Sequence, residues 1–307
     1  MRTAGLPRWA LMVLAVLLSA SRPAFAEPLP VVATLPVLAD FVRVVGGDAV
    51  SVTSLITGLE SEHTYTPKPS DVEAVRRAAV LVKVGLGLEV WVNGLIANAE
   101  NPRLIVVDAS QGIGLMRGGE HDHGDDKDAL PRAEERRSGG NPHVWLDPEN
   151  AQTMVRHVTD GLIKADPARK KTYLANQADY LKELDELTRA LKARFEAIPN
   201  RKIITHHAAW PYFARRFDIR IRGEIFTQIG TEPSAKRIAD LIRLIRKEKI
   251  RVIVSEPQLS PKIPDALAQE TGARVVILTP LPGALPGTDD YLSMMRYNAS
   301  ALLEALR

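Results

Sequence analysis

The chain has 307 residues, no cysteine, and 40 basic against 37 acidic side chains. The lack of cysteine excludes disulfides, thiolate metal sites and a lipid-modified cysteine as an anchor. The excess positive charge comes from Arg2, Arg8 and Arg22, which all lie near the amino terminus. The rest of the chain is close to neutral, so its charge gives no support for nucleic-acid binding.

Residues 1–26 have the pattern of a secretory signal peptide. A basic start and the apolar core "WALMVLAVLLSA" precede "AFA", and this pattern predicts cleavage after Ala26. Later apolar runs are too short or too charged to cross a membrane. We therefore expect a periplasmic, soluble, monomeric protein without a membrane anchor. Its mature length of about 280 residues fits two domains.

Short apolar segments then alternate with amphipathic ones. The predicted strands lie at residues 31–35, 50–56, 79–85 and 104–108, and the predicted helices at 36–46 and 69–78. Strands that alternate with helices in this way are typical of a parallel sheet covered on both faces.

A polar segment interrupts this alternation before residue 142. The stretch "GGEHDHGDDKDALPRAEERRSGG" has no apolar periodicity and predicts a mobile loop over residues 119–140. Its histidines, His121 and His123, lie among acidic residues. Such a tract can serve as an auxiliary metal-binding loop, and it can equally be a solvated surface loop.

Two helical segments follow, at residues 147–165 and 168–198. The second is long, and its apolar residues recur every three or four positions, as expected for a rigid helix between domains. Alternation then resumes, with strands predicted at 202–206, 251–256 and 274–280 and helices at 234–249, 263–272 and 289–306.

The predicted fold class is therefore α/β, with two parallel-sheet domains joined by one long rigid helix. We assign residues 27–150 to the first domain, 151–199 to a helical linker and 200–307 to the second domain. In this architecture a ligand is expected in the cleft between the domains, beyond the carboxyl ends of the strands.

Several histidines follow predicted strand ends or the polar loop. These are His63, His143 and the pair His206 and His207. Histidines at separate strand exits in both halves indicate a metal site across the cleft, and three neutral imidazoles suit zinc. The alternative is that they only hold loops in place through hydrogen bonds. His157 lies within a predicted helix and is expected to be a surface or packing residue.

Six segments resemble the solute-binding proteins of zinc and manganese ABC transporters. They are "EHTYTPKPSDV", "NPHVWLDPEN", "HAAWPYFARRF", "SEPQLSP", "ETGARVV" and "YLSMMRYN", in the family's order and over nearly all of the mature chain. The resemblance implies two α/β domains joined by a rigid helix, with the metal between them. It also implies that His63, His143 and His207 are metal ligands and that His206 is only a neighbour.

The fourth ligand is where the sequence departs from this family. Relatives usually carry an acidic residue after the last strand, and Thr279 occupies that position here. The remaining candidates are Glu62, Glu256 and water. We favour a site of three histidines completed by water or by Glu62.

Three imidazoles with at most one carboxylate favour Zn²⁺ over Mn²⁺, which prefers more oxygen ligands. The resemblance implies a receptor that captures Zn²⁺ in the periplasm and delivers it to the permease of an ABC importer, without catalysis. One alternative is a zinc-dependent hydrolase, with Glu62 or Glu256 as its general base. Another is a manganese-binding or adhesin-like member of the same family.

Overall fold

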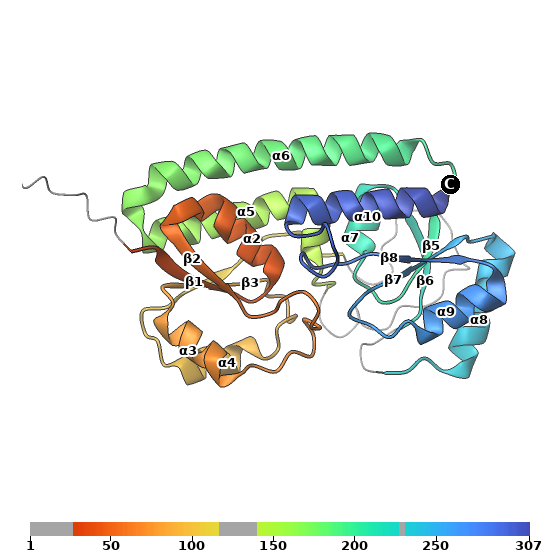
Figure 1. Ribbon diagram of the computed structural model, residues 1–307, viewed down its shortest axis with the longest axis horizontal. Helices are drawn as coiled ribbons and strands as arrows, with labels where there is room; N and C mark the ends of the chain where they lie inside the picture. Colours follow the sequence, from red (N-terminus) through yellow and green to blue (C-terminus); the bar gives the residue numbers. More distant parts are fainter. Residues whose placement is uncertain (1–26, 117–139, 227–230) are drawn as a thin grey trace, which may run out of the picture.

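The computed structural model describes residues 27–116, 140–226 and 231–307. Two four-stranded parallel sheets lie side by side beneath a long helix (Figure 1). This arrangement confirms the predicted fold class. The signal peptide and the pair His121 and His123 lie outside the described residues, so these features remain predictions.

The first sheet and its helices form what we call the first half. Its strands are β1 (Leu29–Ala33), β2 (Val50–Ser54), β3 (Val80–Lys83) and β4 (Ile105–Asp108), in the order β2-β1-β3-β4. Its helices are α2 (Pro36–Gly46), α3 (Pro69–Arg77), α4 (Val92–Ala99) and α5 (Pro148–Ala165). Figure 1 shows α2 and α5 above the sheet and α3 and α4 below it, so both faces are covered.

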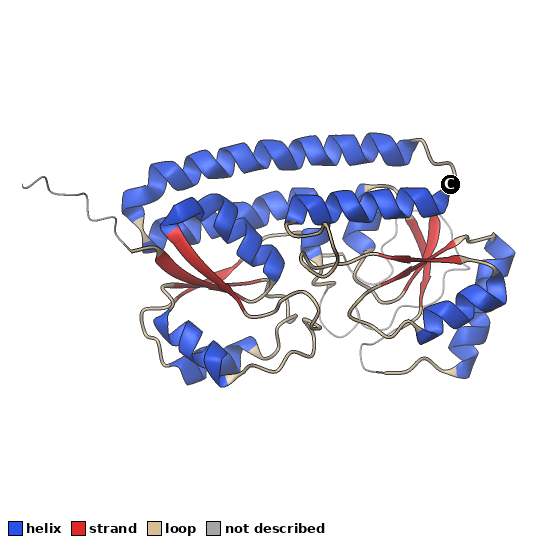
Figure 2. Ribbon diagram, in the orientation of Figure 1, coloured by secondary structure: helices blue, strands red, loops and turns tan. Residues whose placement is uncertain are grey.

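The second half repeats this plan. Its strands are β5 (Lys202–Thr205), β6 (Arg220–Glu224), β7 (Val252–Ser255) and β8 (Arg274–Ile277), in the order β6-β5-β7-β8. Its helices are α7 (Pro211–Arg216), α8 (Ala235–Glu248), α9 (Lys262–Thr271) and α10 (Tyr291–Leu306). In Figure 2, α8 and α9 lie on one side of the sheet and α7 and α10 on the other.

The long helix α6 (Lys170–Glu196) runs over both halves and connects them (Figure 1). Its 27 residues span about 40 Å. It packs against α2 and α5 in the first half and against α10 in the second. A buried row of apolar side chains makes these contacts: Tyr173, Tyr180, Leu184, Leu187, Leu191 and Phe195. The predicted helix between the domains is therefore confirmed.

Buried hydrogen bonds also join the halves around the short helix η3 (Val144–Leu146). Trp145 donates from Nε1 to the carbonyl of Pro280 at 2.7 Å, and the Tyr291 hydroxyl donates to the carbonyl of Trp145 at 2.7 Å. The Tyr212 hydroxyl donates to the carbonyl of Asn141 at 2.8 Å. The segment just before α5 is thus fixed to the second half.

Within the three described ranges, we find no helix with both the length and the apolar character needed to cross a membrane.

Candidate metal centre

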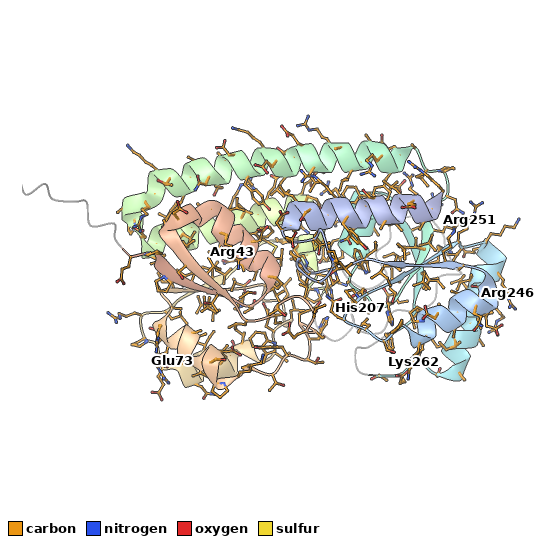
Figure 3. The ribbon with its side chains drawn as sticks, viewed as in Figure 1. Arg43, Glu73, His207, Arg246, Arg251 and Lys262 are labelled. Carbon is orange, nitrogen blue, oxygen red and sulfur yellow. The ribbon has the colours of Figure 1, made fainter. Side chains whose placement is uncertain are left out.

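Four side chains from both halves converge on one point. Glu62 and His63 are the central residues of a turn over 61–64, which is closed by a hydrogen bond of 3.3 Å from Thr64 N to the Ser61 carbonyl. This turn belongs to residues 57–68, which we call the ligand loop and which form most of the segment between β2 and α3. His143 immediately precedes η3, and His207 follows the carboxyl end of β5. Figure 3 shows His207 on the side of the second half that faces the first.

The distances between these side chains fit a single metal ion. One potential ligand atom from each of Glu62, His63, His143 and His207 lies within 4.8 Å of the others. Nε2 of His143 is 3.2 Å from Nε2 of His63 and 3.5 Å from Oε1 of Glu62. Tetrahedral zinc with bonds of about 2.1 Å holds its ligand atoms about 3.4 Å apart. The group is therefore spaced for zinc with only small adjustments.

His143 is fixed in orientation and tautomer by Asn141. The Asn141 side-chain oxygen lies 3.0 Å from Nδ1 of His143 and accepts from the His143 backbone at 2.9 Å. An amide oxygen only accepts, so Nδ1 carries the ring proton and Nε2 directs its lone pair at the other ligands. Burial lowers the pKa of His143 to about 3, so the ring is neutral at pH 7. A neutral, oriented imidazole is the form that binds a metal.

Glu62 brings a buried carboxylate to the same point. Within the described part of the chain, its Oε1 has no hydrogen-bond partner, although it faces the two imidazoles. Burial alone would raise the pKa of Glu62, but the interaction with His143 and the neighbouring imidazoles lowers it to about 2. A buried carboxylate of this kind is costly unless a cation compensates it. A divalent metal ion supplies that cation.

His207 is oriented by Glu256, one of the candidate fourth ligands. Nδ1 of His207 lies 2.8 Å from Oε1 of Glu256, and Trp210 donates from Nε1 to the same oxygen at 3.0 Å. The carboxylate keeps the ring proton on Nδ1, so Nε2 of His207 is the nitrogen available to a metal. Glu256 itself does not belong to the converging group. Its place indicates an orienting role behind His207.

Thr279 takes no part in the group either. Its hydroxyl donates to the Leu281 carbonyl at 2.8 Å and accepts from the Leu281 backbone at 3.1 Å. These bonds hold it within its own loop. Of the carboxylates that sequence analysis weighed, Glu62 is the one that lies with the histidines.

Two other histidines have separate structural partners. His206 is buried, with Nδ1 at 3.0 Å from the Ser255 hydroxyl and its ring stacked on Phe226. Nδ1 of His157 lies 2.9 Å from the Ala109 carbonyl, as expected for a packing residue. The sequence predicts no role for Trp91. It donates from Nε1 to the Glu62 carbonyl at 3.4 Å and so supports the ligand loop.

Residues 31–305 match the protein family described as zinc-uptake complex component A, periplasmic, or ZnuA. The chain belongs to this family. A candidate metal-binding protein of Treponema pallidum is 34% identical over 83% of this chain and 80% of its own length. The zinc-binding protein AdcA of Streptococcus pyogenes is 30% identical over 89% of this chain, which spans 55% of the length of AdcA.

A solved structure agrees with this assignment. A crystal structure of ZnuA superposes with a TM-score of 0.79 and 29% sequence identity. The match covers 92% of this chain and all of that one. The family thus has the fold that carries the four converging side chains here.

If Glu256 orients His207, its removal should weaken the metal site without abolishing it. We expect Glu256→Ala to lower zinc affinity about 10- to 100-fold, the usual effect of losing a carboxylate behind a histidine ligand. Competition with a chromogenic chelator measures this. Glu270→Ala, which changes an exposed carboxylate on α9, serves as the control. A loss as large as that of His207→Ala would show instead that Glu256 binds the metal.

Proposed function

We propose that the chain is a periplasmic receptor that captures Zn²⁺ and delivers it to an ABC importer. The observation that carries this proposal is the convergence of Glu62, His63, His143 and His207 at the junction of the two halves. Membership of the zinc-uptake family supports it. Zn²⁺ is then the cargo of the protein and not a resident cofactor.

The donor set favours zinc over manganese. Three imidazole nitrogens and one carboxylate oxygen are typical zinc ligands, whereas manganese prefers sites richer in oxygen. The family description also names zinc uptake. We therefore do not adopt the manganese-binding and adhesin-like alternatives.

The same geometry favours a receptor over a hydrolase. Catalytic zinc keeps a coordination position for water, but four protein donors fill a tetrahedral shell. A hydrolase would also need a separate general base. Glu62 lies among the ligands, and the Oε1 of Glu256 already accepts from His207 and Trp210. This arrangement is suited to holding an ion.

The proposed location and partner follow from the amino terminus and the family. Residues 1–26 direct export and are cleaved, which leaves the mature chain in the periplasm. The partner is the inner-membrane permease of the importer, with which the mature chain works as a soluble monomer. We propose that His121 and His123 belong to an auxiliary loop that binds zinc weakly.

Zinc binding should stabilise the folded mature protein. When free zinc exceeds the dissociation constant about 1,000-fold, binding adds about 4 kcal/mol to the free energy of unfolding. For a chain of this size we expect the melting temperature to rise by about 7 °C. Calorimetric titration should show one tight zinc per chain, with a much smaller thermal shift from manganese. An equal or larger shift with manganese would contradict the zinc assignment.

A further inference from the structure

The start of the ligand loop is bonded across the junction to the second half. Gln258, which follows β7, donates from Nε2 to the carbonyl of Gly58 at 2.6 Å. The segment 282–284 of the second half also lies against Gly58. A Cβ added to Gly58 would lie 2.5 Å from the carbonyl oxygen of Pro282 and 3.2 Å from the backbone nitrogen of Ala284. The two halves therefore meet at Gly58 with almost no space between their backbones.

The backbone conformation at this position adds a second requirement for glycine. Gly58 has φ of +105°, a value that side chains with a Cβ rarely adopt. The atoms that a methyl group would meet belong to the backbone and have little freedom to move. A larger residue at position 58 must therefore displace the loop from the second half.

Displacement at Gly58 would reach the ligands through a short chain of contacts. Gly58 lies inside a turn over residues 57–60, in which the Glu60 carboxylate accepts from the backbone and the hydroxyl of Thr57 at 2.9 and 2.6 Å. Two residues after Glu60 comes Glu62, followed by His63. Both ligands therefore depend on where the start of the loop lies.

The distribution of ligands makes this contact important for metal retention. Glu62, His63 and His143 come from the first half, and His207 alone comes from the second. An ion held by all four needs the ligand loop to stay against the second half. We propose that Gly58 and Gln258 are positioning residues, which together hold the ligand loop closed and limit the rate of metal release. The proposal rests on the proposed function only for the identity of the metal.

Release kinetics test this proposal. The mature protein is loaded with zinc and mixed rapidly with excess chelator, and the dissociation rate is compared among variants. We expect Gly58→Ala to raise the rate about 10-fold and Gln258→Ala to raise it about 3-fold, the effect of one lost hydrogen bond. Association rates should change much less, because a displaced loop does not obstruct entry.

A matched control separates retention from general destabilisation. Gly87 also has positive φ, +78°, but a Cβ there meets no atom within 4 Å. Gly87→Ala therefore introduces similar backbone strain without the clash. We expect it to leave the dissociation rate unchanged. Metal-free Gly58→Ala should unfold at a lower urea concentration than Gly87→Ala, because it adds the clash with the second half to the strain. Gln258→Ala introduces neither strain nor clash, so its faster release would not reflect a strained backbone.

The outcomes distinguish this proposal from the proposed function. Equal dissociation rates for Gly58→Ala, Gln258→Ala and Gly87→Ala would overturn the positioning role, while tight binding by the wild type would leave the zinc receptor intact. If the wild type holds a different divalent ion tightly, and Gly58→Ala releases that ion faster, the positioning role stands and the zinc assignment falls.

Discussion

Replacing His143 by alanine is expected to lower zinc affinity about 100- to 1,000-fold. A four-ligand zinc site is worth about 10–16 kcal/mol, so one ligand contributes about 3 kcal/mol, and about 1.4 kcal/mol corresponds to a tenfold change. His143 should show the full effect, because its ring is buried, neutral and already oriented by Asn141. Calorimetric titration measures the loss of zinc affinity. Chelator competition replaces it for proteins that bind zinc too tightly for calorimetry.

His157→Ala is the appropriate control for this experiment. It removes an imidazole that contacts the Ala109 carbonyl and takes no part in the converging group. Its zinc affinity should equal that of the wild type. Tight binding that survives His143→Ala and disappears only when His121 and His123 are replaced would place the main site in the 119–140 loop and refute our ligand set.

The sequence predicts regular elements best where their ends carry clear signals. The helix expected at residues 36–46 is α2 (Pro36–Gly46), because proline favours the first turn and Gly47, with φ of +53°, ends the helix. Strand β6 (Arg220–Glu224) was missed. Its arginines resemble a surface segment, but Arg222 is buried and its guanidinium pairs with Glu248 at 2.7 Å. That pairing is a tertiary contact, which local pattern does not reveal.

The histidines of the candidate site were predictable, but the role of each carboxylate was not. Glu62 and Glu256 both follow strands in the sequence. Glu62 immediately precedes His63, and Glu256 lies beside His207 in space. What separates them is side-chain direction. Glu62 points at the imidazole Nε2 atoms, whereas Glu256 contacts Nδ1 of His207 from behind. Direction within a loop depends on its packing, and spacing in the sequence does not determine it.

The largest expected loss of stability comes from Arg216, which links the second half to the start of α5. Its guanidinium donates from Nε and Nη2 to the two carboxylate oxygens of Asp147, at 2.7 and 2.9 Å. The Asp147 side chain is fully buried and also caps α5 by accepting from the Glu149 backbone at 3.0 Å. Arg216→Met would leave this carboxylate buried without its main partner. We expect the free energy of unfolding in urea to fall by about 3 kcal/mol.

Arg215→Met is the matched control, because Arg215 lies beside Arg216 but reaches Asp147 only at 3.6 Å and is half exposed. An exposed ion pair contributes little, so we expect a loss below about 1 kcal/mol. Similar losses for both variants would show that Asp147 does not depend on Arg216.

Zinc affinity should fall less than tenfold in Arg216→Met, because Asn141 still orients His143. His143→Ala should instead lower zinc affinity strongly and the free energy of unfolding less, since it removes a ligand while Asp147 and Arg216 remain paired. The two variants therefore separate the residues that bind the ion from those that hold the halves together around it.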